Sequence, residues 1–334
     1  VEIAERVLDG EELPRYVYIG PDDTPGLEEI PPINHASVNG LVEVTRGCPR
    51  RCKFCPVTLR PLRHYTLQMI EEELKVNVRE GVVHGILHSE DVLLYGADGI
   101  IPNPDAVIKL HELAKRYYRT IAWSHASLAS VKCGEERFKL VSRLREIICD
   151  EEQDYWGVQI GIETGSVRLA EKIMPAKSAP YPISSWPQVV EDALTILHEN
   201  NCISACTLIV GVPGETEEDV YATIELLDRL EHLRFLVVPM FYVPMGLLAS
   251  KSDWFKNVDL SEVHAELLLK CLRHSIRCAK EVLDRFYMRE ARHWLVRIAL
   301  KHFLSAAERY AKRATTSGLV EMVRERRVET AMSR

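Results

Sequence analysis

Residues 46–60 read RGCPRRCKFCPVTLR, and the three cysteines in this stretch decide both the fold and the chemistry of the chain. Cys48, Cys52 and Cys55 have the spacing C-x3-C-x2-C and follow the apolar stretch 41–44. Three thiolates on one short loop can hold three corners of a cubic iron–sulfur cluster and leave the fourth iron open. A cluster needs such an open iron in order to bind and reductively cleave a small molecule. The spacing therefore predicts a [4Fe-4S] cluster with these three metal ligands.

Two other interpretations of the cysteines are weaker. Structural zinc prefers four closed ligands, and no fourth Cys or His lies within ordinary zinc-finger spacing except His64. A disulfide framework is disfavoured because the chain is too large and too mixed in composition for a disulfide scaffold. The other six cysteines show no paired pattern, so we expect buried thiols in a reducing compartment.

The composition indicates a folded, water-soluble protein. A length of 334 residues allows one large α/β domain with a smaller addition, and a hydrophobic content of 46% is ample for a core. The net charge of −7 gives no strong nucleic-acid signal. The longest apolar run, 235–249, is interrupted by proline and glycine and is too short to span a bilayer. With no signal peptide at the start, we expect a cytoplasmic location.

Strands and helices are predicted to alternate from residue 41 onward. The expected strands are 41–46, 92–96, 120–124, 156–163, 205–211 and 235–241. The expected helices begin with one capped at Thr66 and continue at 104–117, 135–149, 166–174, 187–200 and 216–231. Six βα units with nearly continuous apolar strands predict a partial (β/α)6 barrel, with ligands at the C-terminal ends of the strands.

The chain is predicted to have four parts. Residues 1–40 are an N-terminal helix and a Pro-rich linker, residues 41–245 are the barrel, residues 246–314 are a C-terminal helical region, and residues 315–334 are a solvated tail. Because the chain opens at Val1 in a helix-like stretch, we expect it to be a fragment of a longer polypeptide.

Two amphipathic helices are predicted within the C-terminal region, at 261–285 and 290–314. We expect their apolar faces to pack into the core, including Trp294, Leu295 and Ile298 on the second helix.

The cysteine string, with Phe54 before the last cysteine, resembles the signature of the radical S-adenosylmethionine (radical SAM) superfamily. In that family the amino and carboxylate groups of SAM chelate the open iron. One electron from the cluster then cleaves SAM and yields a 5′-deoxyadenosyl radical. The resemblance implies the same partial barrel, SAM as a cofactor, Phe54 among the cofactor-binding residues, and a reductant such as ferredoxin or flavodoxin as a partner.

The family also has a Gly-Gly-Glu-like motif after its second strand, where the backbone and one acidic side chain receive the SAM ammonium. The string YGADG, residues 95–99, resembles it. The resemblance assigns Gly96 and Ala97 to backbone contacts and Asp98 to the amine, with Asp in place of the usual Glu. An ordinary turn between a strand and a helix is the alternative.

Three further predicted strands carry candidate site residues near their C-terminal ends. In SHAS, Ser124 is a candidate for the SAM carboxylate or for a helix cap, and His125 for proton transfer. QIGIETGS resembles the family's ribose-binding motif, which implicates Gln159 and Glu163; a salt bridge inside the barrel is the alternative for Glu163. In IVGVPGET, Val210 is a candidate adenine contact.

The connector upstream of the cysteines resembles the junction with a cobalamin-binding domain in class B radical SAM methyltransferases of archaea and bacteria. That resemblance implies cobalamin as a further cofactor and methylation of an unactivated carbon. Some archaeal relatives modify methyl-coenzyme M reductase, so a protein substrate is expected. Radical C–C bond formation or cyclisation on a lipid or small metabolite is the enzymatic alternative, and an iron–sulfur electron-transfer or redox-sensing protein is the non-enzymatic one.

Two related activities are disfavoured. Methylthiotransferases carry an additional N-terminal cysteine trio, which this sequence does not show. In two-cysteine RNA methylases the methyl-carrying Cys lies in a late motif, whereas Cys271 and Cys278 lie on an amphipathic helix. No catalytic residue is assigned from the sequence. The unranked candidates for radical quenching or acid–base chemistry are His64, His125, Tyr242 and Cys206.

Overall fold

The computed structural model describes residues 2–13, 25–251, 260–287 and 293–323. The chain divides into two compact units, residues 1–32 and residues 33–334. The first unit contains the predicted N-terminal helix, α1 (Glu2–Leu8), and a short 3-10 helix, η2 (Leu27–Glu29). Residues 14–24, most of the predicted connector, lie outside the described residues. The second unit contains the cysteine loop and every described strand.

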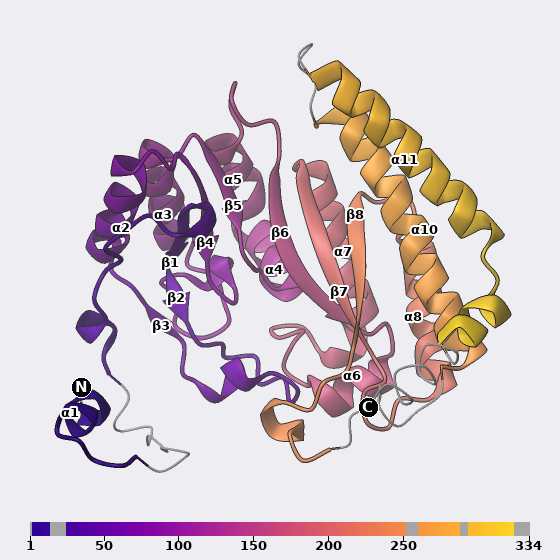
Figure 1. Cartoon of the computed structure of the whole chain (residues 1–334), viewed down its shortest axis with the longest axis horizontal. Helices are drawn as coiled ribbons and strands as arrows, with labels where there is room; N and C mark the ends of the chain where they lie inside the picture. Colours follow the sequence, from indigo (N-terminus) through magenta and orange to yellow (C-terminus); the bar gives the residue numbers. More distant parts are fainter. Residues whose placement is uncertain (1, 14–24, 252–259, 288–292, 324–334) are drawn as a thin grey trace. The chain divides into compact units, whose positions relative to one another are not determined.

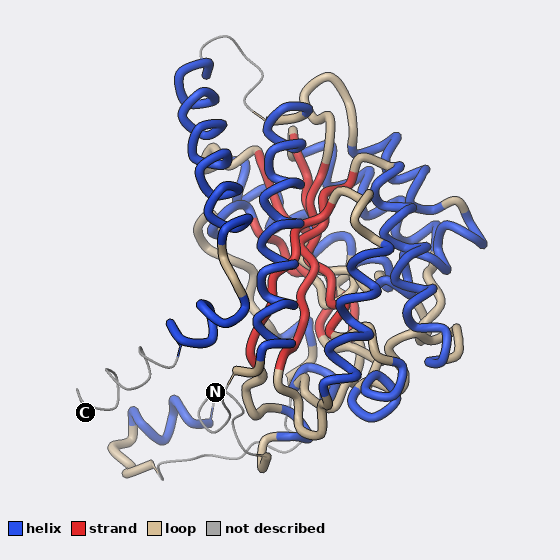
Figure 2. The backbone as a smooth tube through the Cα atoms, turned by 90° about the vertical axis from the view of Figure 1, so that its right-hand side faces the viewer, coloured by secondary structure: helices blue, strands red, loops and turns tan. Residues whose placement is uncertain are grey.

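Parallel strands form the centre of the second unit (Figures 1 and 2). Along the chain they are β1 (Leu41–Glu43), β4 (His84–His88), β5 (Thr120–Trp123), β6 (Trp156–Glu163), β7 (Cys202–Val210) and β8 (Phe235–Phe241). Their order is β1-β4-β5 and β6-β7-β8, and a parallel bridge between His125 and Gln159 joins the two sets. This arrangement confirms the predicted partial (β/α)6 barrel.

Helices cover the outer side of these strands, as Figure 2 shows. They are α2 (Leu67–Arg79), α3 (Pro104–Tyr117), α4 (Leu128–Phe138), α5 (Leu140–Ile148), α6 (Val167–Ile173), α7 (Trp186–Glu199) and α8 (Glu217–Arg229). The cap predicted at Thr66 is confirmed, because its side chain accepts a hydrogen bond from the backbone of Met69. Fully buried side chains such as Trp156 and Trp186 fill the layer between strands and helices.

The second strand was predicted at the wrong place. It is β4, and the predicted strand 92–96 contains a 3-10 helix, η5 (Val92–Leu94), instead. The apolar run was misleading because the η5 side chains are completely buried without belonging to the sheet. Gly85 weakens the sequence pattern of the true strand, β4. A Cβ at this position would lie 1.9 Å from the Tyr118 ring, so close packing leaves no room for a strand-forming side chain.

The helix predicted at 135–149 is two helices. Lys139, with φ 52°, adopts a left-handed conformation that ends α4 and precedes α5. The first of them begins earlier than predicted, because Ser127 of the SHAS string caps it by accepting from the Ser130 backbone.

The predicted C-terminal helical extension is present. Helix α10 (Glu262–Arg285) packs against β8 and α8, and α11 (Trp294–Arg313) packs along α10 (Figure 1). The predicted start of the second helix at residue 290 lies outside the described residues. The expectation that its apolar side chains are buried is wrong, because Trp294, Leu295 and Ile298 are 57%, 63% and 44% exposed.

In the described part of the predicted tail, every residue except Val320 is exposed or half-exposed. Residues 316–323 form a helix whose Val320 is buried against Leu260 and Ala265. In the part of the chain that the structure describes, no helix is both long enough and apolar enough to cross a membrane.

Candidate functional site

The cysteine loop is closed at its base by a short antiparallel ladder. Strands β2 (Thr45–Arg46) and β3 (Arg63–His64) pair with each other immediately after β1, so that residues 47–62 form a loop at the C-terminal end of that strand. Gly47 has φ 92°, and a Cβ there would lie 2.1 Å from the carbonyl oxygen of Pro61. Only glycine lets the two sides of the loop approach so closely.

All three cysteines of this loop are free thiols. Cys52 is buried, and Cys48 and Cys55 are half-buried. The hydroxyl of Thr58 donates to the carbonyl oxygens of Cys52 at 3.1 Å and of Cys55 at 2.9 Å, which holds the second half of the loop. Burial raises the pKa of Cys52 to about 11, so this thiol keeps its proton until a metal displaces it.

Arg50 anchors the first half of the loop to three other segments. Its guanidinium is 3% exposed and pairs with Asp91 after β4, at 3.3 Å. It also donates to the hydroxyl of Ser130 in α4 at 2.6 Å, and to the carbonyl oxygens of Lys177 and Ala179 at 2.9 Å each. One buried side chain therefore links the cysteine loop to the segments that follow β4, β5 and β6.

His64 is not available as a fourth metal ligand. Its Nδ1 accepts from the backbone of Gly96 at 3.1 Å, and its Nε2 lies 3.1 Å from the carbonyl oxygen of Ala97. Both ring nitrogens are therefore engaged within the protein. Three thiols on one loop are the donor set of a cubic cluster with one open iron, although no His, Cys, Asp or Glu side chains in the described part of the chain are gathered into a preformed metal-binding group.

Unpartnered polar atoms gather at the C-terminal end of β4. Nδ1 of His88, Oε2 of Glu90 and Oδ1 of Asp91 are buried, and none has a hydrogen-bond partner among the described residues. Burial raises the pKa of Glu90, although hydrogen bonds from its own backbone and from that of Gly47 oppose the rise. Buried acceptors are rarely left unsatisfied, so this cluster fits a ligand that carries hydrogen-bond donors.

These groups lie at the end of the second strand or directly after it, whereas the Gly-Gly-Glu-like motif was predicted at residues 95–99. That motif follows the second strand, and the second strand ends at His88, so Ser89, Glu90 and Asp91 occupy the position that the sequence interpretation gave to YGADG. The role of YGADG in SAM binding stays a prediction. The acidic turn is marked in the sequence by Glu90 and Asp91, which follow HGILH after one serine.

The structure places Gly96, Ala97 and Asp98 beyond η5. The backbone groups of Gly96 and Ala97 contact His64, and the side chain of Asn103 donates to the Gly96 carbonyl at 2.9 Å. Asp98 is exposed. The backbone of this string is thus already hydrogen-bonded to other groups of the protein.

Ser124 follows the end of β5, and Gln159 lies in the middle of the neighbouring strand β6. The hydroxyl of Ser124 donates to the carbonyl of Ser89 and accepts from its N–H, both at 2.9 Å, so it holds the acidic turn after β4. The backbone N–H of Gln159 donates to the Ser124 carbonyl at 3.1 Å, and its side chain is exposed. The rings of His88 and His125 lie 6.4 Å apart beside them.

Glu163 ends β6 and pairs with Lys177, which the sequence interpretation did not include. Their charged atoms lie 2.7 Å apart, and both side chains are nearly buried. Burial alone would lower the pKa of Lys177, but the charge of Glu163 and the hydrogen bond to it raise that pKa, so the lysine stays protonated. The predicted salt-bridge alternative for Glu163 is therefore present. A weak 3.4 Å contact from Thr207 leaves its Oε2 with spare acceptor capacity.

Gly161 makes room for this ion pair. A Cβ at this position would lie 1.8 Å from Oε1 of Glu163 and 2.6 Å from Nζ of Lys177. Glu163 itself has φ 64°, at a shift of the strand register next to Gly161. A non-glycine residue in that conformation is uncommon and is held by its surroundings.

The remaining candidates are mostly buried. Val210 is 1% exposed and shares the buried face of β7 with Cys206, whose pKa burial raises to about 12. The hydroxyl of Tyr242 donates to the carbonyl of Leu248 at 2.9 Å. Phe54 is half-buried between two of the cysteines.

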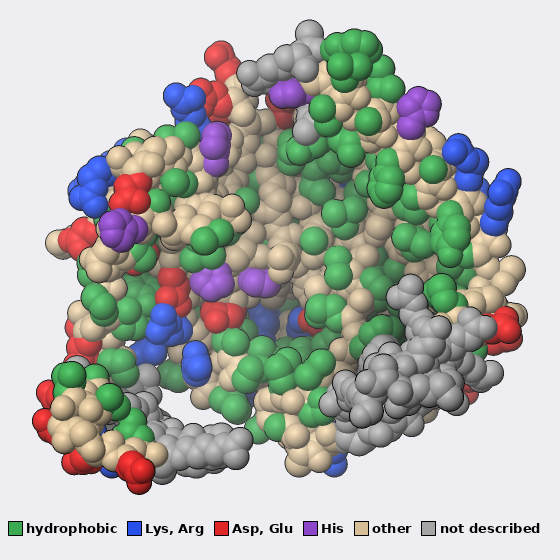
Figure 3. Space-filling model, viewed as in Figure 1, with side chains coloured by type: hydrophobic (Ala, Val, Ile, Leu, Met, Phe, Trp, Pro, Cys, Tyr) green, Lys and Arg blue, Asp and Glu red, His purple; other side chains and the backbone are tan. Residues whose placement is uncertain are grey.

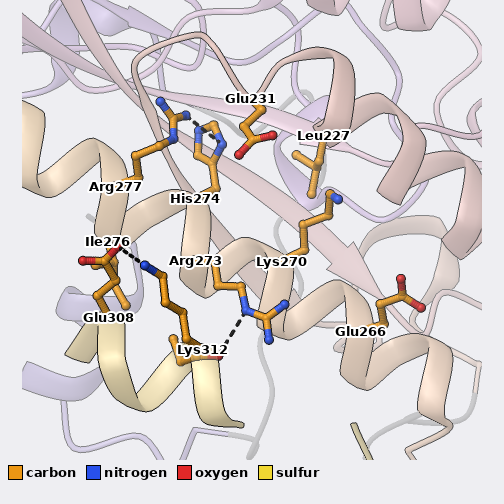
Figure 4. A pocket seen from close by; sticks show the side chains of 11 residues that line it. Leu227, Glu231, Glu266, Lys270, Arg273, His274, Ile276, Arg277, Glu308 and Lys312 are labelled. Carbon is orange, nitrogen blue, oxygen red and sulfur yellow. Dashed lines mark hydrogen bonds and ion pairs between the residues drawn. The ribbon is translucent and has the colours of Figure 1, made fainter. Parts of the chain in front are cut away.

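A cavity of about 410 Å³ lies apart from these groups, between α8, α10 and α11 (Figure 4). Its charged side chains are largely engaged within the protein: Lys312 pairs with Glu308 at 2.9 Å, and Arg273 donates to the Ala311 carbonyl at 3.1 Å. It shares no residue with the cysteine loop or the strand ends, so it is not part of the candidate site.

The sequence matches a family model and is similar to known proteins. Residues 42–227 match the family model of the radical SAM superfamily. The ribosomal protein uS12 methylthiotransferase RimO of Petrotoga mobilis is 25% identical over 74% of this chain and 51% of its own length. The tRNA-2-methylthio-N(6)-dimethylallyladenosine synthase of a Sulfurihydrogenibium species is 24% identical over 70% of this chain and 47% of its own.

A solved structure that resembles the chain is the radical SAM methyltransferase TsrM of Kitasatospora setae with cobalamin and a [4Fe-4S] cluster bound. The TM-score is 0.43 and the identity 16%, over 62% of this chain and 35% of that one. The chain spans about half the length of the curated relatives that it matches. Because the matching family model covers more than half of the chain, the chain belongs to the radical SAM superfamily.

Proposed function

We propose that this radical SAM enzyme holds a [4Fe-4S] cluster on Cys48, Cys52 and Cys55 and uses it to form a 5′-deoxyadenosyl radical for carbon methylation with cobalamin. The observation that carries the cluster site is the loop itself, whose three cysteines are all free thiols. When bound, the cluster supplies one electron to the sulfonium of SAM, which separates into methionine and the radical.

The strand ends offer complementary groups for SAM. We place the SAM ammonium at the unpartnered oxygens of Glu90 and Asp91, in place of the predicted contacts at 96–98. The charge of Lys177 acts on the buried Cys52, where it opposes the rise in pKa that burial causes, and this cation suits the SAM carboxylate. Glu163 and Gln159 suit the ribose hydroxyls, because Oε2 of Glu163 keeps spare acceptor capacity.

Cobalamin and a protein substrate are the finer parts of the proposal. Their support is the resemblance of the upstream connector to class B methyltransferases. The radical would take a hydrogen atom from an unactivated carbon of the substrate, a protein such as methyl-coenzyme M reductase, and methylcobalamin would donate the methyl group. Radical cyclisation or C–C bond formation on a small molecule is the alternative if the full-length polypeptide does not bind cobalamin.

Methylthio transfer is a second candidate, because the relatives named above are methylthiotransferases. It was disfavoured on the sequence because the 47 residues before Cys48 contain no cysteine. Iron content separates the two activities. A single cluster contributes about four irons per chain, whereas a further cysteine trio would raise the count to about eight.

The test is anaerobic reconstitution of the full-length polypeptide, followed by its cobalamin absorption spectrum and an assay with isotopically labelled SAM methyl groups. We expect stoichiometric cobalamin and label on carbon. Absence of cobalamin while SAM cleavage persists would overturn the methyltransferase proposal in favour of the small-molecule alternative. Label recovered on sulfur would favour methylthio transfer.

A further inference from the structure

The segment that carries the cysteines has an unusual charge. In residues 46–63 there is no Asp or Glu, although the chain as a whole has a net charge of −7. The basic residues of this segment are Arg46, Arg50, Arg51, Lys53, Arg60 and Arg63. A local excess of one sign in a chain of the opposite sign points to a charged partner.

Two of these cations are used inside the protein. Arg46 pairs with Glu43 at 2.6 Å, and Arg50 pairs with Asp91. By contrast, Arg51 and Arg60 are exposed and Lys53 is half-exposed, and none of the three has an ion-pair partner among the described residues. The structure therefore leaves at least three positive charges free on the outside of the cysteine loop.

An exposed apolar patch lies among these charges. The 3-10 helix η4 (Pro56–Leu59) begins directly after Cys55 and packs against η7 (Gly246–Leu248), the turn that follows β8. The backbone N–H of Leu247 donates to the carbonyl of Lys53 at 2.7 Å, which fixes η7 against the cysteine loop.

Leu59 and Leu247 are 60% and 63% exposed although they lie on adjoining elements. In Figure 3, hydrophobic side chains gather at the lower centre, where Figure 1 draws the short orange helix η7. We call this area, comprising η4, η7, Arg51, Lys53 and Arg60, the η4–η7 surface. It combines an apolar centre with a basic margin, directly beside the cluster ligand Cys55.

We propose that the η4–η7 surface is the docking site of an acidic, low-potential one-electron carrier protein. The inference rests on the proposed function, because an electron must reach the cluster for every SAM that is cleaved. The carrier loses one electron and the cluster gains it; the cluster then passes it to the sulfonium, whose C–S bond breaks. An acidic partner complements the basic margin, and contact at η4 places it next to a cluster ligand.

The test compares two reductants. Release of 5′-deoxyadenosine is measured with dithionite, which needs no docking, and with an acidic flavodoxin held reduced by its reductase. The surface variant is Arg60→Glu/Leu247→Ser. The control is Lys109→Glu/Leu295→Ser. It likewise reverses one exposed positive charge, on α3, and replaces a leucine of α11 that is also 63% exposed.

With flavodoxin at low ionic strength, we expect the surface variant to lose on the order of tenfold in rate, and the control to match the wild type. With dithionite all three proteins should agree within about twofold, and the flavodoxin-driven rate of the wild type should fall as salt is added. Equal flavodoxin-driven rates in the surface variant and the control would overturn the inference.

Two further outcomes are informative. If the wild type forms no 5′-deoxyadenosine even with dithionite, the proposed function fails, which is a different failure from loss of docking. If the surface variant keeps its flavodoxin-driven rate but loses binding to a tRNA in a gel-shift assay, the surface serves nucleic acid, and the inference is overturned.

Discussion

Replacement of Arg50 by methionine should destabilise the protein far more than loss of an ordinary surface arginine. The change removes the buried cation that pairs with Asp91, which keeps only the hydrogen bond from the Ser130 hydroxyl, and it removes the donor to the carbonyl oxygens of Lys177 and Ala179. Breaking a buried ion pair by removing one partner costs about 3–5 kcal/mol. We therefore expect the unfolding equilibrium constant of the apo-protein, from urea denaturation, to rise by between about two and four powers of ten.

Arg51→Met is the matched control, since Arg51 is exposed in the same loop and its loss should change the free energy of unfolding by no more than about 0.5 kcal/mol. The double variant Arg50→Met/Asp91→Leu removes both charges and should cost less than the sum of the single changes. If Arg50→Met costs less than about 1 kcal/mol, the pair behaves like an exposed ion pair, and Arg50 is not the anchor described above.

Three further changes test the site and its surroundings. Glu90→Gln should stabilise the apo-protein above about pH 4.5, because burial raises the Glu90 pKa and its ionisation opposes folding; the same change should weaken SAM binding, measured by equilibrium dialysis. Gly161→Ala should displace the Glu163–Lys177 pair, cost about 1–3 kcal/mol and weaken SAM binding, whereas Gly157→Ala, whose Cβ meets nothing nearer than 3.7 Å, should do neither. Burial lowers the pKa of His111 to about 4. Between about pH 6.5 and pH 4 the unfolded chain therefore binds a proton at this residue that the folded chain does not bind, so the free energy of unfolding should fall as the pH falls through this range. The fall should be less steep in His111→Gln. An unchanged pH slope in that variant, or unchanged SAM affinity in the other two, would contradict these assignments.

Much of the barrel could be predicted because its strands have strong local signals. The strand over residues 156–163 was predicted with its observed bounds, since apolar side chains alternate there with small or polar ones. The strand at 84–88 was missed because Gly85 and two histidines weaken its pattern, and close packing against Tyr118 is the reason for the glycine. Tyr118, which requires a glycine at position 85, lies 33 positions away, so this requirement leaves no local signal in the sequence.

In the candidate site, too, only the features with a local signal in the sequence could be predicted. The cysteine spacing is a local signal, and so is the acidic residue at the end of β6. Lys177 could not be found in this way, because it reaches Glu163 only after α6 turns the chain back across the strand ends. The roles of Arg50 and His64 likewise depend on contacts between segments far apart in the sequence.

The most direct test of the cluster site compares single cysteine variants after anaerobic reconstitution. Iron content and 5′-deoxyadenosine release with dithionite are measured for Cys48→Ala, Cys52→Ala and Cys55→Ala, with Cys149→Ala as a half-buried control outside the loop. We predict about four irons per chain and SAM cleavage in the wild type and the control, and loss of SAM cleavage in all three loop variants. SAM cleavage with an unchanged cluster spectrum in any loop variant would contradict the account.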